Sequence, residues 1–212
     1  MKVPVQKAFL QVLFGILLLL LLPNCHHLSP EEEAELAFVE QHRKQKDLLF
    51  KTNENSPLLP EDKASFTGLH YYPVDISFRF EGPIIRYDSV MIDTIRATGG
   101  DLRPALKYGY FDFVYRQQRY RLQIYKMLRE EPELQHLLFL GFTDETNGKE
   151  TYGGGRYIDL TENEENYYVV DFNLAYNPYC AYNPAYTCAI PPPENHLPFP
   201  VTAGEKLFKK HE

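Results

Sequence analysis

The chain has 212 residues, a formal net charge of −7 and 24% charged residues. This length supports one domain with its own hydrophobic core. Because nucleic-acid binding depends on clustered Lys and Arg, the acidic balance argues against a nucleic-acid partner. The chain contains 16 Tyr, 14 Phe and no Trp. This composition is typical of β-sheets, since planar side chains cover a pleated surface well.

The N-terminus predicts export. Lys2 and Lys7 precede an apolar run over residues 8–22, and a short segment ending in cysteine follows. A short basic region before an apolar core of this length is typical of a secretory signal peptide, which we place at residues 1–24. The core is shorter than the roughly 20 apolar residues that a bilayer span prefers, and an uncleaved anchor is the alternative.

Cys25 lies where a bacterial lipoprotein carries its lipidated cysteine. Leu22-Pro23-Asn24-Cys25 resembles a lipobox, although Asn24 replaces the usual Gly, Ala or Ser. We therefore expect a membrane-anchored lipoprotein of the bacterial cell envelope, facing the periplasm or the cell surface. Processing would leave 188 residues with 20 basic and 29 acidic side chains, so acyl chains rather than surface charge would hold the protein at the membrane. A plain signal peptide with an incidental cysteine is the alternative.

Residues 25–55 predict the anchor attachment followed by a helix. The sequence Ser29–Glu32 forms a capping box with proline at the first helical position, and the helix is expected to reach about Phe50. Its middle, residues 40–46, is fully polar, which favours a helix that docks only near its end. Residues 53–57 then break the helix.

Residues 56–206 predict a single β-rich domain, followed by a frayed tail over 207–212. A hairpin is expected between 108–115 and 120–127, across a turn at 116–119. No helix of crossover length separates the predicted strands, so parallel βαβ units are disfavoured. We expect six to eight antiparallel strands in a barrel or sandwich. The other predicted strands are 76–80, 90–95, 137–142, 156–160 and 167–173.

The segment 177–200 contains many prolines and is expected to wrap the β domain as an ordered loop. Two cysteines in an exported chain, Cys180 and Cys188, favour a disulfide that pins this loop. Two free thiols, or half of a metal site, are the alternatives. Cys-x7-Cys is not a standard zinc spacing, and no metal site is predicted.

Arg156 is the leading candidate for ligand binding. It follows three glycines, including Gly154 and Gly155, so backbone amides could approach a ligand while the guanidinium clamps a carboxylate or phosphate. Tyr152 would lie on the same loop. In the alternative interpretation the glycines form a tight corner and Arg156 pairs with an acidic side chain, namely Asp144, Glu150 or Asp159.

Asp144 and Glu150 bracket an Asn-Gly turn and could serve as acid and base. Such residues also stabilise their own loops through side-chain hydrogen bonds. His70 lies among aromatic residues and is a candidate base or ligand, with a structural hydrogen bond as the alternative. No sequence motif for metal catalysis or a nucleophile elbow is present.

A tyrosine cluster over residues 176–186 is a second candidate site. Aromatic faces can stack on a sugar or another polar ligand, while nearby amides recognise its hydroxyls. Alternatively, the tyrosines pack on the β domain and the asparagines form turns. The asparagines concerned are Asn173, Asn177, Asn183 and Asn195.

Four segments carry a family resemblance. They are Thr143–Gly148, Thr151–Tyr157, Asp171–Tyr182 and Pro191–Asn195. Together they resemble the bacterial family catalogued as domain of unknown function 1684, over roughly residues 56–206. The resemblance supports the domain boundaries and the importance of the last third of the chain, and it implies no catalytic residue.

Three functional hypotheses follow. The first is a non-catalytic envelope lipoprotein whose β domain binds a small polar or anionic ligand or a protein partner. The second is a hydrolase that uses Asp144, Glu150 or His70 beside Arg156, which requires these groups to converge in a cleft. The third is a flavin binder with Arg156 on the phosphate, which rests on fold-level analogy; no other cofactor is indicated.

Overall fold

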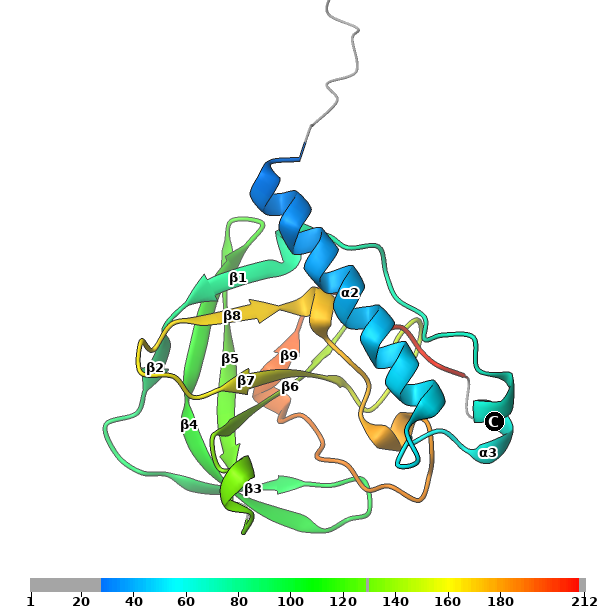
Figure 1. Cartoon of the computed structure of the whole chain (residues 1–212). Coiled ribbons are helices and arrows are strands. Elements are labelled where there is room, and N and C mark those ends of the chain that lie inside the picture. The colour runs from blue at the N-terminus through cyan, green and yellow to red at the C-terminus, as the bar shows by residue number, and fades with distance from the viewer. Residues whose placement is uncertain (1–27, 129, 210–212) are drawn as a thin grey trace, which may run out of the picture. The chain divides into compact units, whose positions relative to one another are not determined.

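The protein is described by a computed structural model over residues 28–128 and 130–209 (Figure 1). Clustering of its internal contacts divides the chain between Glu33 and Ala34. The predicted signal peptide and Cys25 lie outside the described residues. Among the helices that are described, none combines the length and apolar character needed to cross a bilayer.

Helix α2 (Pro30–Thr52) begins where the capping box predicted. The Ser29 hydroxyl accepts a hydrogen bond from the Glu32 amide at 3.2 Å, and the Glu32 carboxylate accepts one from the Ser29 amide at 2.7 Å. The helix ends two residues beyond the predicted Phe50. A short helix α3 (Pro60–Ser65) follows the predicted break.

The β domain contains nine strands within the described residues. They are β1 (Arg79–Gly82), β2 (Ile84–Arg86), β3 (Ile92–Arg96), β4 (Leu102–Tyr115), β5 (Gln118–Met127), β6 (Leu137–Asp144), β7 (Arg156–Thr161), β8 (Tyr168–Asp171) and β9 (His196–Leu197). A short 3-10 helix precedes β1 at Ile76–Phe78, and others lie between the strands at Pro132–Leu134, Phe172–Leu174, Tyr179–Ala181 and Pro193–Asn195.

The strands confirm a mainly antiparallel fold. Seven strands form one sheet in the order β2-β4-β5-β6-β7, with β3 also paired to β4 and β9 to β6, whereas β1 and β8 form a separate pair. The β6–β9 pairing is parallel and the other strand pairs are antiparallel. Within the described residues the large sheet does not close on itself, so the architecture is sandwich-like and not a barrel.

The Phe172 ring joins the two sheets at the centre of the core. It contacts aromatic rings at centroid distances of 5.0 to 6.4 Å, and its side chain is fully buried. Its partners come from both sheets and from the turn before β1, so one aromatic cluster fills the sandwich. They are Phe78, Phe80, Phe113 and Phe142.

The predicted hairpin forms β4 and β5, with a tighter turn than the sequence indicated. The expected four-residue turn at 116–119 is wrong, because pairing continues to Tyr115 and Gln118. Only Arg116 and Gln117 remain in the turn, and both have positive φ, 48° and 65°. Two central residues of this conformation match the right-handed twist of the flanking strands, which explains the shorter connection.

The proline-rich segment 177–200 is an ordered loop that wraps the domain. Strand β9 pairs with β6, and the amide of Ile190 donates a 2.7 Å hydrogen bond to the carbonyl of Arg96. Beyond it, part of the predicted frayed tail is described: Phe208 packs on Tyr182 with ring centroids 5.4 Å apart. Residues 210–212 lie outside the described residues.

Replacing Gly204 with alanine tests whether the C-terminal segment needs glycine where it passes close to Phe172. Gly204 has φ +76°, and an added Cβ would lie 2.5 Å from the carbonyl oxygen of Phe172, whereas Gly100 has φ +88° with nothing within 4 Å. We expect Gly100→Ala to cost about 1–2 kcal/mol from its backbone conformation alone. Gly204→Ala should cost about 1–3 kcal/mol more, because of the steric overlap. Urea denaturation of both variants measures this difference, and equal losses would contradict it.

Candidate functional site

Arg156, at the start of β7, is fully buried and binds the protein itself. Its Nη2 donates to Asp144 Oδ2 at 2.9 Å and to the carbonyl of Val201 at 2.9 Å. Its Nη1 donates to the carbonyl of Ala203 and, at 3.3 Å, to that of Glu205. Burial lowers the pKa of Arg156, and Asp144 opposes this effect. The arginine therefore connects β6 and β7 to the C-terminal segment and presents no exposed edge to a ligand.

The glycine loop before Arg156 makes a tight corner. Gly155 has φ +88°, and a Cβ there would lie 2.6 Å from Pro191 Cγ and 2.7 Å from the carbonyl oxygen of Phe142. Only glycine fits this conformation and this close approach. Gly154 and Tyr152 are also packed within the loop, where the Tyr152 hydroxyl donates to Cys180 Sγ at 3.6 Å. The loop therefore matches the alternative interpretation, in which the glycines form a tight corner and Arg156 pairs with an acidic side chain.

Asp144 is separated from the other two acid–base candidates. It is buried and accepts hydrogen bonds from Arg156, from Thr146 and from the amide of Val201. His70 and Glu150 instead line one open cavity of about 570 Å³. The ammonium group of Lys206 lies 3.8 Å from Glu150 in an ion pair. The structure thus brings His70 and Glu150 to one surface and leaves Arg156 and Asp144 in the interior.

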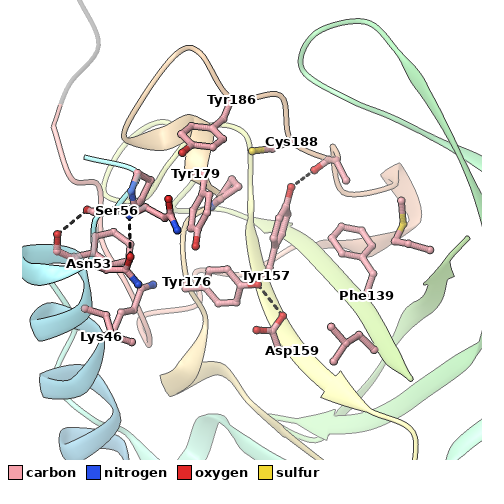
Figure 2. A pocket seen from close by; sticks show the side chains of 18 of the residues that line it. Lys46, Asn53, Ser56, Phe139, Tyr157, Asp159, Tyr176, Tyr179, Tyr186 and Cys188 are labelled. Carbon is pink, nitrogen blue, oxygen red and sulfur yellow. Dashed lines mark hydrogen bonds between the residues drawn. The ribbon is translucent and has the colours of Figure 1, made fainter. Parts of the chain in front are cut away.

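A larger cavity of about 600 Å³ is lined by Tyr176, Tyr179 and Tyr186 of the predicted tyrosine cluster (Figure 2), whereas Tyr182 of that cluster is fully buried elsewhere. One wall comes from the second half of α2 and the turn at 53–57. The opposite wall comes from β6, β7 and the loop 176–189. This cavity gathers more aromatic surface than the others described, with Tyr157, Tyr176, Tyr179, Tyr186 and Phe139 along its lining.

The aromatic rings of the cavity hold one another in place. The Tyr157 ring meets Phe139 edge-on at 4.9 Å and Tyr176 at 5.9 Å, and Tyr179 meets Tyr186 at 5.3 Å. The Tyr157 hydroxyl donates to the carbonyl of Ala189, and the Tyr176 hydroxyl donates to Asp159 Oδ1 at 2.7 Å. Two hydroxyls are therefore fixed by partners, and both rings have defined orientations before any ligand arrives.

The charged side chains of the cavity are largely paired within the protein. Lys46 binds the buried carboxylate of Glu205 at 2.7 Å, and Arg103 donates to Asp101 at 3.0 Å and to Thr187. Burial lowers the pKa of His42; Lys46 and Arg43 add to this effect, and Asp159 opposes it. A neutral polar ligand therefore suits this cavity better than a strongly charged one.

Cys180 and Cys188 lie together but do not form the predicted disulfide; both are free, buried cysteines. The Cys180 amide donates to Cys188 Sγ at 3.2 Å. The loop is pinned by hydrogen bonds instead, since Cys188 and Thr98 exchange two, at 3.0 and 2.9 Å. A hydrogen bond from the Cys188 thiol lowers the pKa of Cys180 to about 6, and the same interaction raises the pKa of Cys188.

The predicted amide cluster is mostly structural. Asn195 donates to the carbonyls of Gln123 and Gly141, Asn173 donates to that of Asp75, and Asn177 donates to Glu205. The amides that do line the tyrosine cavity are Gln45, Asn53 and Asn55. No local pattern marked them, because Gln45 lies in the polar middle of α2, which was interpreted as a face that does not dock, and Asn53 and Asn55 lie in the predicted helix break.

That interpretation of α2 is wrong. Val39 is fully buried, Arg43 donates to the carbonyls of Tyr72 and Asn173 at 2.9 and 3.1 Å, and Lys46 reaches Glu205. The polar middle of the helix docks through side-chain hydrogen bonds, which an apolar pattern cannot reveal. In the part of the chain that the structure describes, no three His, Cys, Asp or Glu side chains gather as metal ligands.

Fold and cavity together define a β-sandwich protein whose helix covers a tyrosine-lined hollow. The chain belongs to the family described as "Protein of unknown function (DUF1684)", whose model matches residues 64–206. It is similar to an uncharacterized protein of Haloarcula marismortui solved by NMR in solution, with 29% identity and a TM-score of 0.65, over 87% of this chain and 100% of that one. No curated protein matches.

Arg156→Met should destabilise the fold by about 3–5 kcal/mol, because it leaves the Asp144 carboxylate buried without its cation. Urea denaturation measures the loss. The matched control is Arg121→Met, which removes the exposed bidentate pair with Asp112 on the β4–β5 hairpin and should cost about 0.2–1 kcal/mol. Similar losses in the two variants would contradict a structural role for Arg156.

Proposed function

We propose that this protein is a cell-envelope lipoprotein whose β domain binds a small polar ligand in the tyrosine-lined cavity. The observation that carries the proposal is the cavity itself: about 600 Å³, with five aromatic side chains opposite three side-chain amides. Ligand sites in proteins have this size and combine apolar walls with a few polar groups that fix orientation. The fixed rings of Tyr157 and Tyr176 limit the entropy lost on binding.

The ligand chemistry follows from the lining. Ring faces favour a flat or weakly polar face of the ligand, and the amides of Gln45, Asn53 and Asn55 can donate and accept hydrogen bonds. The fixed charges already have protein partners, so a ligand need not neutralise them. These properties favour an uncharged ring compound with polar substituents.

The membrane anchor remains part of the proposal. It is supported by the basic residues, apolar run and lipobox-like segment that end at Cys25. Several acyl chains on that cysteine would hold the β domain at the membrane surface. Mass spectrometry of the protein from bacterial membranes tests this directly, since a chain starting at Cys25 with added acyl groups is expected.

Tyr179→Ala tests the cavity. We expect a thermal-shift screen of the purified chain against sugars, nucleotides, flavins and organic acids to give a hit among the neutral polar compounds. A ligand at 100 times its dissociation constant adds about 2.7 kcal/mol of stability, and Tyr179→Ala should lower the affinity about tenfold through lost ring contact. Tyr167 is also exposed but lines no part of this cavity, so Tyr167→Ala should bind normally. Equal weakening in both variants would exclude the cavity.

A hydrolase is the second candidate, favoured by one observation: His70 and Glu150 share an open cavity with Lys149 and Lys206. It predicts turnover of p-nitrophenyl esters or phosphates that falls at least about a hundredfold in His70→Ala or Glu150→Gln, as expected for loss of a general acid or base. His136→Ala, at another exposed histidine, should retain the activity. Turnover that is absent, or that survives both substitutions, would reject this candidate.

A further inference from the structure

A second cavity, of about 470 Å³, adjoins the tyrosine-lined one. The two share His42, Asp159 and Tyr176 in their linings. The second cavity lies between α2, which contributes Phe38, and strands β7 and β8, which contribute Ile158 and Val169. The two cavities are therefore neighbours that meet at these three side chains.

Asp171, at the end of β8, lines the second cavity and has one carboxyl oxygen without a partner in the described part of the chain. Its side chain is 2% exposed. Oδ1 accepts hydrogen bonds from the backbone amide of Asn173 at 2.8 Å and from its side-chain amide at 2.9 Å. Oδ2 has no hydrogen-bond partner among the described residues. A buried carboxyl oxygen without a partner is costly, so this atom is the strongest indication of a ligand in the second cavity.

The cation beside this carboxyl is already engaged. Arg79 lies 3.2 Å from Glu35 through Nε and binds Glu81 through Nη1, although it also lines the cavity. Burial raises the pKa of Asp171, with Glu35 adding to the effect, and hydrogen bonds from Asn173 together with Arg79 oppose it. Oδ2 can therefore carry a proton or a charge, depending on what lies opposite.

A hydroxyl group satisfies Oδ2 in either state, because it both donates and accepts a hydrogen bond. An ammonium ion can only donate, and a carbonyl can only accept. The ring of Phe38 and the side chains of Ile158, Val169 and Leu174 supply apolar contact around this polar point. Hydroxyls on an apolar ring face are the chemistry of a saccharide.

We propose that the two cavities form one saccharide-binding groove, in which Tyr176 separates two ring subsites and Asp171 binds a hydroxyl of the second ring. This inference rests on the proposed function and names its ligand class. It requires a saccharide of at least two rings, since one ring cannot reach from the tyrosine cluster to Asp171 and still fill both cavities.

The test uses the full chain in a detergent without a sugar headgroup, titrated calorimetrically with saccharides of increasing length. The probes are glucose, maltose and maltotriose, and N-acetylglucosamine with its two-ring and three-ring β-1,4 oligomers. In at least one series we expect affinity to rise about tenfold or more from one ring to two, as one hydrogen bond to a carboxylate and new apolar contact would give.

Two variants separate the subsites. Val169→Trp fills the second cavity from β8, and Asp171→Asn keeps the size of the side chain while removing its charge. We expect the gain from the second ring to disappear in Val169→Trp and to shrink several-fold in Asp171→Asn, with one-ring binding unchanged. Val114→Trp, at an exposed valine of β4 outside both cavities, is the matched control and should keep the full gain.

The outcomes distinguish this inference from the proposed function. One-ring binding without a gain from longer saccharides, or a gain that survives Val169→Trp, overturns the second subsite and leaves the tyrosine cavity as a ligand site. Binding of a non-saccharide to the tyrosine cavity, with no saccharide bound at any length, overturns the saccharide assignment alone. If no compound binds in a way that Tyr179→Ala weakens, both the saccharide inference and the proposed tyrosine-cavity site are overturned.

Discussion

The buried ion pair between Arg156 and Asp144 is the interaction on which the arrangement of the domain depends. An arginine keeps its charge in proteins, so a fully buried guanidinium must be surrounded by acceptors. One carboxylate is too few, and the C-terminal segment supplies carbonyls from Val201, Ala203 and Glu205. The positive φ of Gly204 lets the chain pass close to Phe172 and Ala175 while it supplies them.

The same segment then places helix α2. Glu205 is fully buried, and its carboxylate accepts hydrogen bonds from Tyr182 and Asn177 and binds the ammonium group of Lys46. The ammonium group also lies over the Tyr176 ring, 4.7 Å from its centroid. A connection therefore runs from Arg156 through the C-terminal segment to the helix, and the tyrosine-lined cavity is the space this connection leaves between helix and sheet.

Local patterns could predict the secondary structure but not these connections. The capping box at Ser29 and the alternation in β4 and β5 are read within a few residues, and both were confirmed. The glycines before Arg156 indicated an unusual backbone conformation, and Asp144 was among the predicted partners of Arg156. The docking of Lys46 has no local signature, because Glu205 lies 159 residues away; a polar stretch of helix is the same whether it meets solvent or a buried acid. Asp171 opens one of the segments that carry the family resemblance, but no local pattern showed that it lines a cavity, since α2, β1 and β7 supply most of that lining.

Two buried carboxylates, Glu205 and Asp171, show how a structural group differs from a candidate binding group. Both oxygens of Glu205 have donors within the protein, one of them a cation, so nothing remains for a ligand to satisfy. Asp171 is nearly as buried and lines a cavity, yet only one of its carboxyl oxygens has a hydrogen-bond partner among the described residues. Arg156, the most conspicuous residue of the sequence, has acceptors for both terminal nitrogens and lines none of the three cavities described above, so its unpartnered Nε has no cavity beside it. An unused hydrogen-bonding atom in a residue beside a cavity therefore indicates a binding group better than charge or burial alone does. This criterion favours the groove beneath α2 over the glycine–arginine loop as the binding site.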